Sequence, residues 1–219
     1  MQPKIEQAFR DVPIDVHLYG PAGSPLANQI KIGTAEPNLT KGRALLISLM
    51  DSYSVPGYRL SHLEIQKLAY FLQEVGEPMK LRFEKNKYGP YAENLNHVLQ
   101  RIEGHFIRGY GDRSREAEIY LLEGAASWAE TILEKDQDSL ERLKKVKELI
   151  QGFETPYGLE LLATVHWVMK NNSESARDLT FVTKEVQNWN ERKKKLFSTK
   201  HIEKVWHYLQ SLKTVSISV

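Results

Sequence analysis

Apolar residues recur at helical spacing through most of the chain after position 38. Positions three or four apart share one face of an α-helix, so each such stripe predicts a helix with one buried side. One stripe follows Ser61 and stops at Gly76, and Ser61 and Glu64 have the spacing of a capping box. A second stripe follows Pro90, which a first helical turn tolerates, and stops at Gly104. These two segments are the best delimited of the predicted helices.

Further stripes predict six more helices, and one alternating pattern predicts a hairpin. The helices are expected near residues 45–53, 125–133, 140–150, 156–169, 179–189 and 202–212. Residues 106–110 and 117–122 alternate, which predicts two strands around a turn at 111–116. The sequence therefore predicts a mainly α fold with a small β-hairpin (α+β). Its helix–helix–hairpin core would be similar to that of winged-helix proteins.

The first 38 residues have a different character from the rest. Residues 14–20 alternate like one strand, and residues 21–38 are rich in Pro, Gly, Ala and Asn, as linkers are. We therefore predict a division into residues 1–38 and one helical domain at residues 39–219. The alternative is that residues 14–20 form a native strand of a small sheet.

Composition narrows the class of protein. Hydrophobic residues make up 41% and charged residues 26% of the chain, as in folded globular proteins. The formal net charge of +2 indicates neither a nucleic-acid nor a membrane partner. No apolar run has the length of a membrane span, and no signal-peptide core is present. The absence of cysteine excludes disulfides and thiolate zinc sites and fits the expected cytoplasmic location.

Motifs for chemistry are sparse. The sequence lacks the glycine-rich dinucleotide and P-loop patterns and the nucleophile elbow of hydrolases. Its seven histidines do not have the spacing of zinc ligands. We therefore expect no catalytic residue, no cofactor and no metal. The basic block 192–195 is typical of a solvated face, so direct nucleic-acid binding is not expected.

A mixed polar and aromatic string between residues 58 and 122 resembles a known family. The segments QKLAYFLQ, LRF, YGPYAENLNHVLQRIEGH and GYGD resemble the C-terminal domain of DarG antitoxins. The QKL helix and YGP turn are more loosely similar to Panacea, or SocA-like, antitoxin domains. The resemblance implies a non-enzymatic domain that binds a DarT-like toxin, which transfers ADP-ribose from NAD to single-stranded DNA. It implies inhibition by covering the toxin's DNA site, through DNA mimicry.

The resemblance also suggests how the first segment arose. A macro domain precedes the antitoxin domain in DarG-like proteins, so residues 1–38 would be its remnant plus a linker. The glycine-rich loops of a macro domain are absent here, so the hydrolase activity of such a parent is not expected in this chain.

A DNA mimic would present carboxylates and flat side chains to a cationic groove that stacks bases. The candidate toxin-binding residues are Tyr88, Glu93, Asn94, Tyr110, Asp112 and Glu116; Glu74, Glu77, Glu103 and Glu118 are further acids. The alternative function is a winged-helix-like DNA-binding regulator that places the 90–104 helix in the DNA groove. Arg101 is the only Lys or Arg of that helix, which disfavours this alternative.

Overall fold

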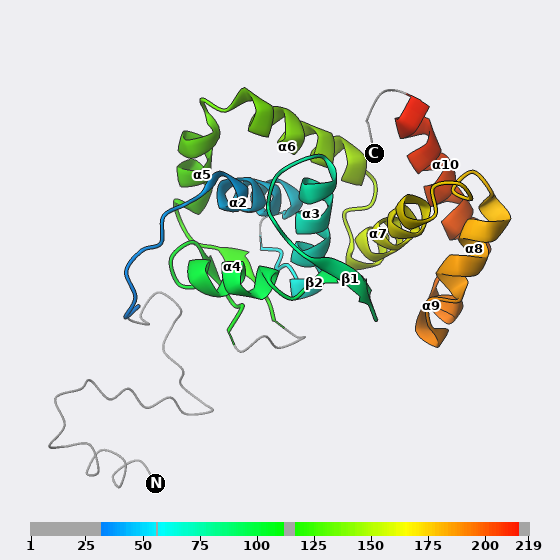
Figure 1. Cartoon of the computed structure of the whole chain (residues 1–219). Helices are drawn as coiled ribbons and strands as arrows, with labels where there is room; N and C mark the ends of the chain where they lie inside the picture. Colours follow the sequence, from blue (N-terminus) through cyan, green and yellow to red (C-terminus); the bar gives the residue numbers. More distant parts are fainter. Residues whose placement is uncertain (1–31, 56, 112–116, 215–219) are drawn as a thin grey trace, which may run out of the picture. The chain divides into compact units, whose positions relative to one another are not determined.

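The computed structural model describes residues 32–55, 57–111 and 117–214 (Figure 1). The chain divides into two units, residues 1–35 and 36–219, and every element named below belongs to the second. The helices are α2 (Lys41–Tyr53), α3 (His62–Glu74), α4 (Leu95–Ile102), α5 (Ala125–Leu133), α6 (Gln137–Ile150), α7 (Pro156–Asn171), α8 (Leu179–Gln187), α9 (Glu191–Leu196) and α10 (Thr199–Thr214). The strands are β1 (Phe83–Asn86), β2 (Gly89–Ala92), β3 (Ile107–Arg108) and β4 (Tyr120–Leu121). The strand expected at residues 14–20 lies outside the described residues, and the division at residue 38 stays a prediction.

Helix α3 is the central element of the second unit. It packs against α2 and α6 on one side and against α7 on the other, and α7 in turn packs against α8 and α10 (Figure 1). Leu68 and Phe71 on α3 are fully buried. The predicted capping box is confirmed, because Ser61 Oγ accepts from the Glu64 amide at 3.3 Å and Glu64 Oε2 accepts from the Ser61 amide at 2.7 Å. The cap fixes where α3 begins.

The expected helix start at Pro90 is wrong. Strands β1 and β2 form an antiparallel hairpin there, with Asn86 opposite Gly89, and α4 begins only at Leu95. Gly89 has a φ of +95°, which suits the glycine of a hairpin bulge and not a helix. Pro90 is tolerated because a two-stranded sheet has only edges. The apolar stripe of α4 is confirmed by the burial of its residues Leu95, Leu99 and Ile102.

The hairpin predicted from residues 106–110 and 117–122 is confirmed, with shorter strands than expected. β3 pairs antiparallel with β4, and Ile119 pairs with Leu60 just before α3. Gly109 has a φ of +95°, and a Cβ on it would lie 2.0 Å from the Glu118 carbonyl oxygen, so this close approach requires glycine.

The described residues are mainly helical with small antiparallel sheets, which confirms the predicted fold class. The β1–β2 hairpin separates the two helices of the expected winged-helix-like core. The order is therefore helix, hairpin, helix, hairpin. Within the described ranges, no helix is both long and apolar enough to cross a membrane.

Candidate functional site

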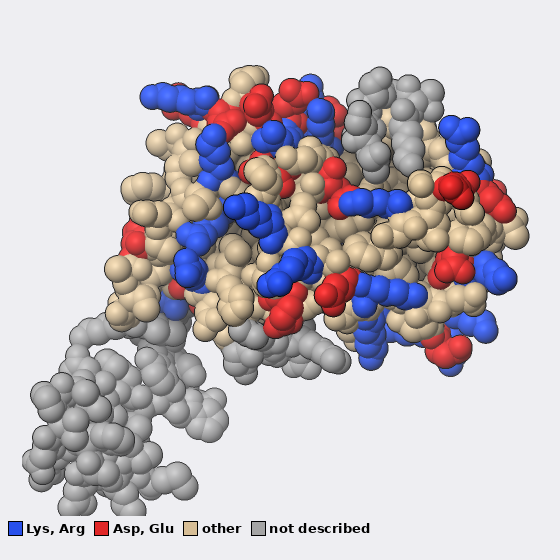
Figure 2. Space-filling view, viewed as in Figure 1, with Lys and Arg blue, Asp and Glu red and all other residues tan. Residues whose placement is uncertain are grey.

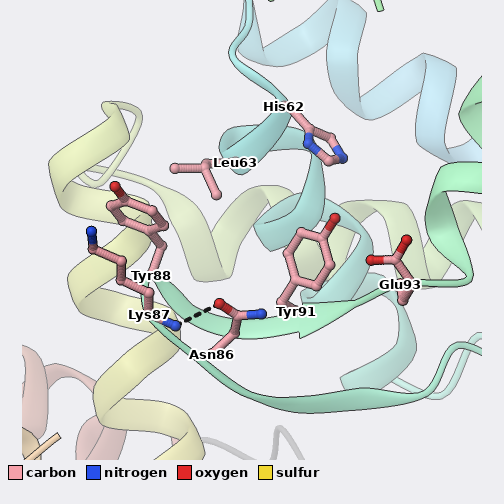
Figure 3. A pocket seen from close by; sticks show the side chains of 7 residues that line it. All are labelled: His62, Leu63, Asn86, Lys87, Tyr88, Tyr91 and Glu93. Carbon is pink, nitrogen blue, oxygen red and sulfur yellow. Dashed lines mark hydrogen bonds between the residues drawn. The ribbon is translucent and has the colours of Figure 1, made fainter. Parts of the chain in front are cut away.

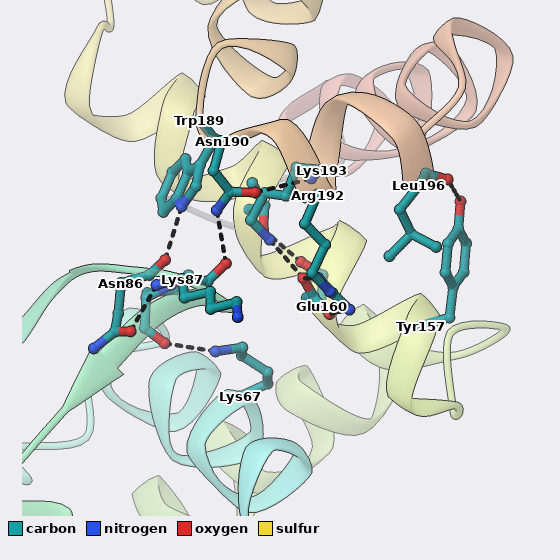
Figure 4. Close-up of polar contacts among 12 residues, drawn as sticks. Lys67, Asn86, Lys87, Tyr157, Glu160, Trp189, Asn190, Arg192, Lys193 and Leu196 are labelled. Carbon is teal, nitrogen blue, oxygen red and sulfur yellow. Dashed lines mark hydrogen bonds and ion pairs between the residues drawn. The ribbon is translucent and has the colours of Figure 1, made fainter.

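The β1–β2 hairpin is held from two sides by side chains of other elements. From α3, Gln66 exchanges hydrogen bonds of 3.0 and 3.1 Å with the backbone of Ala92. From the turn between α8 and α9, Trp189 Nε1 donates to the Asn86 carbonyl at 2.8 Å and Asn190 Nδ2 to the Lys87 carbonyl at 3.0 Å (Figure 4). These bonds hold both strands of the hairpin, which pre-organises the side chains that the turn carries.

A cleft of about 430 Å³ lies between this hairpin and the start of α3 (Figure 3). We call it the hairpin cleft. Its lining combines aromatic, amide, cationic and acidic side chains: His62, Leu63, Asn86, Lys87, Tyr88, Tyr91 and Glu93. A second hollow, on the side of Arg82 and His97, shares Asn86, Tyr91 and Glu93 with it. The hairpin cleft and this second hollow are therefore neighbours, separated by the side chains that line both.

Cations lie over the faces of aromatic rings around the hairpin. The Arg192 guanidinium carbon lies 4.7 Å from the centre of the Tyr88 ring, and Lys87 Nζ lies 5.4 Å from it. Lys85 Nζ lies 4.6 Å from the centre of the Trp189 ring. Such cation–π contacts orient the cations without neutralising them. Positive charge and flat aromatic surface therefore occur together at this edge of the molecule.

Of the residues expected at a binding surface, Tyr88 and Glu93 line the hairpin cleft. Asn94 borders the neighbouring hollow and braces the preceding loop, donating to the Lys80 carbonyl and accepting from the Arg82 amide, each at 3.0 Å. Tyr110 does not lie at an exposed tip as expected. Its side chain is 1% exposed, with its ring centre 5.6 Å from that of His62.

The two remaining candidates, Asp112 and Glu116, lie outside the described residues. Whether the candidate residues contact a partner stays a prediction.

Several of the expected surface acids are engaged within the protein. Glu77 is 5% exposed and pairs with Arg142, and Glu74 accepts from Lys170 Nζ at 2.7 Å. Glu103 accepts from the backbone amides that follow β3. On the face seen in Figure 2, acidic and basic side chains are intermixed. On that face the described residues therefore show no continuous acidic surface of the kind that DNA mimicry would require.

A buried charged cluster that the sequence did not predict lies behind the hairpin. Glu160 on α7 accepts from both terminal nitrogens of Arg192, at 2.5 and 3.0 Å, and from Lys193 Nζ at 2.7 Å. Lys193 is fully buried, although its basic block suggested a solvated face. Lys67 on α3 is 1% exposed and donates to the Pro90 carbonyl at 2.7 Å. The available signal was Glu160 itself, a charged position among Leu159, Leu161 and Leu162 of α7.

Burial and neighbouring charges together set the pKa values of this cluster. Burial, and next the neighbouring charge of Lys193, lowers the pKa of Lys67 to about 7. Burial lowers the pKa of Lys193 to about 8, against the opposing effect of Glu160. Burial acts to raise the pKa of Glu160, but hydrogen bonds and charge from Arg192 and Lys193 outweigh it and hold that pKa below its usual value.

We expect Lys67 to make stability rise with pH above neutrality. Between its folded pKa of about 7 and its ordinary value of 10.5, the unfolded chain binds a proton that the folded chain lacks. The cost of burying the cation is therefore present in full below pH 7 and is relieved as the pH rises. Urea unfolding measured from pH 7 to pH 10.5 should show a larger increase in the free energy of unfolding for the wild type than for Lys67→Met. Equal pH slopes for the two proteins would contradict the assignment.

Residues 32–55, 57–111 and 117–214 hold no group of three or more His, Cys, Asp or Glu that could bind a metal ion. The titratable groups on the hairpin cleft are His62, Lys87, Tyr88, Tyr91 and Glu93. The cleft can therefore stack a flat ring, pair with an anion and accept hydrogen bonds from hydroxyl groups.

Three curated relatives share extended similarity with the chain. It is 46% identical over 180 residues to a protein of Thermus aquaticus named "DNA ADP-ribosyl glycohydrolase". It is 32% identical over 220 residues to proteins of the same name from Mycobacterium bovis and Mycobacterium tuberculosis. The matches cover 82% and 92% of this chain but 49% and 61% of those proteins, so the chain spans about half to three fifths of their length. No protein-family model matches the chain.

These names correct the function expected from the sequence. Each is the name of an enzyme, so it contradicts the expectation of a non-enzymatic toxin inhibitor of the DarG type. The names do not favour the alternative DNA-binding regulator either. The expected DarT-like partner and the expected lack of nucleic-acid binding are not tested by these matches and stay predictions. The printed names thus describe the relatives as enzymes that act on ADP-ribose attached to DNA.

Proposed function

We propose that this chain is part of an enzyme that hydrolyses the bond between ADP-ribose and DNA. We further propose that its hairpin cleft holds the modified nucleotide. The observation that carries the first proposal is the 46% identity, over 82% of the chain, to a protein named DNA ADP-ribosyl glycohydrolase. This proposal replaces the expectation that the chain makes no direct contact with nucleic acid.

The hairpin cleft supports this substrate class by its size and its side chains. A volume of about 430 Å³ falls within the range of small-molecule sites. An ADP-ribosylated nucleotide offers flat bases, a diphosphate and ribose hydroxyls. Tyr88 and Tyr91 offer ring faces for stacking, Lys87 offers a cation for a phosphate, and Glu93 and Asn86 offer acceptors for hydroxyls. This combination of aromatic, cationic and hydrogen-bond-accepting side chains suits an ADP-ribosylated nucleotide better than a ligand that carries only negative charge.

We assign binding, and not bond cleavage, to the cleft residues. Glycoside hydrolysis commonly uses two carboxyl groups, one as the acid and one as the base or nucleophile. The cleft lining contains one carboxylate, that of Glu93. The chemical step therefore requires a further group from outside the cleft.

The test measures removal of ADP-ribose from a single-stranded oligonucleotide that carries it on one base. Three proteins are compared: this chain, the segment of the Thermus relative that lies outside the match, and the two joined. Mass spectrometry follows the return of the strand to its unmodified mass. We expect the joined protein to act at least about tenfold faster than the relative's segment alone, because tighter binding of the strand raises the rate at low substrate concentration.

A matched pair of variants connects this activity to the cleft. Tyr88→Ala in the joined protein should remove most of the rate increase over the relative's segment alone. Tyr120→Ala should not, although Tyr120 is also half-buried beneath a cation, with the Arg59 guanidinium carbon 3.5 Å from its ring centre. Equal rates for the joined protein and the relative's segment, with no turnover by this chain, would overturn the proposal.

A further inference from the structure

A smaller hollow, of about 290 Å³, lies behind the hairpin between the starts of α3 and α7. We call it the rear hollow. Lys67, Glu160 and Arg192 border it, and Leu63 separates it from the hairpin cleft, since that residue lines both. Figure 4 shows Arg192 reaching from α9 to Glu160, whereas the ammonium group of Lys67, from α3, points to the backbone of the hairpin, where it donates to the Pro90 carbonyl. The polar walls of the rear hollow thus come from three separate helices.

The buried charges around the rear hollow do not balance. Lys67 and Lys193 are 1% and 0% exposed, and Arg192 is half-buried. Within the described ranges, the one carboxylate hydrogen-bonded to these cations is Glu160, which Arg192 and Lys193 already share. Among the residues that the structure describes, the acceptor of Lys67 Nζ is the neutral carbonyl of Pro90. In the described part of the chain, three basic side chains therefore lie around this region, and a single carboxylate is hydrogen-bonded to two of them.

A buried cation without a counter-charge is costly, so an excess of this kind favours either loss of a proton or capture of an anion. The rear hollow provides space for an anion next to the unbalanced groups. A phosphate group suits it, because several oxygens can accept from ammonium and guanidinium donors at once. We propose that the rear hollow binds a phosphate group.

Two sources share this chemistry: the diphosphate of ADP-ribose and the backbone phosphates of DNA. The site itself does not rest on the proposed function, because inorganic phosphate alone tests it. Failure of phosphate binding would leave the glycohydrolase assay unaffected, and failure of that assay would leave phosphate binding unaffected. The two proposals can therefore fail separately.

The first experiment titrates the chain with inorganic phosphate by isothermal calorimetry at near-neutral pH, against sodium chloride of equal ionic strength. Phosphate should bind with measurable heat and raise the midpoint of thermal unfolding, since a ligand of the folded state stabilises it. Lys67→Met should weaken phosphate binding by at least about tenfold, because it removes the cation that lacks a counter-charge.

Two further variants guard against a change of fold in Lys67→Met. Leu196→Glu adds a carboxylate at the partly exposed rim of the rear hollow and should weaken phosphate binding without altering the core. Lys184→Met removes an exposed lysine on α8 and should leave phosphate binding unchanged. ADP-ribose and an unmodified oligonucleotide are then tested as competitors, and the stronger of the two identifies the source of the phosphate. Equal effects of phosphate and chloride, or unchanged phosphate binding by both Lys67→Met and Leu196→Glu, would overturn the inference.

Discussion

Replacing Glu160 with glutamine is expected to lower the free energy of unfolding by about 3–5 kcal/mol. The substitution keeps the shape of the side chain but removes the carboxylate that Arg192 and Lys193 share. Lys193 is fully buried, so its ammonium group would lose its charged partner and be left with two neutral acceptors, the amide oxygen of residue 160 and Thr164 Oγ1 at 3.0 Å. Chemical unfolding by urea, followed by circular dichroism, measures the change.

A surface glutamate provides the matched control for this prediction. Glu141 pairs with Lys145 on the exposed face of α6, and Glu141→Gln should change stability by less than about 1 kcal/mol. The double variant Glu160→Gln, Lys193→Met should be more stable than Glu160→Gln alone, because the uncompensated ammonium group is then absent. A loss below about 1 kcal/mol for Glu160→Gln would show that this cluster does not stabilise the packing of α9 on α7.

Replacing Leu68 with alanine is expected to lower the free energy of unfolding by about 2–5 kcal/mol. Leu68 is fully buried on α3, the helix that packs against α2, α6 and α7. Truncation removes apolar contacts and leaves a cavity that helices on both sides of α3 can fill only in part. If the slope of the free energy of unfolding against urea concentration is unchanged, the lost stability is assigned to the folded state.

The control for Leu68→Ala is an apolar truncation on the surface. Val55 is 68% exposed, and Val55→Ala should change stability by no more than about 0.5 kcal/mol. Similar losses for the two variants would mean that α3 is not the centre of the core.

The helices were largely predictable because their apolar stripes and caps are local features. The capping box of Ser61 and Glu64 gave the start of α3 correctly. The β1–β2 hairpin was missed because the segment FEKN is almost entirely polar and exposed and shows no apolar alternation. Side chains far away in the sequence hold it instead, such as Trp189, which bonds to Asn86 across 103 positions. Helix α9 was missed for a related reason, since its one buried lysine is matched by Glu160 on another helix.

The candidate site was predictable only where its residues lie next to the hairpin turn. Tyr88 and Glu93 were recognised from the local string, and both line the hairpin cleft. His62 was not, because it comes from the start of α3 and reaches the cleft only through the fold. Tyr110 was misplaced because its burial depends on packing against the ring of His62, which lies far away in the sequence. The functional correction came from the relatives and not from a motif.

The most direct measurement of the central claim, that the hairpin cleft holds the modified nucleotide, compares two oligonucleotides of identical sequence. One carries ADP-ribose on a single base and the other is unmodified, and fluorescence anisotropy gives the affinity of the chain for each. We expect at least about tenfold tighter binding of the modified strand, with that preference lost in Tyr88→Ala and kept in Tyr120→Ala. Equal affinity for the two strands, or a preference that survives Tyr88→Ala unchanged, would contradict the claim.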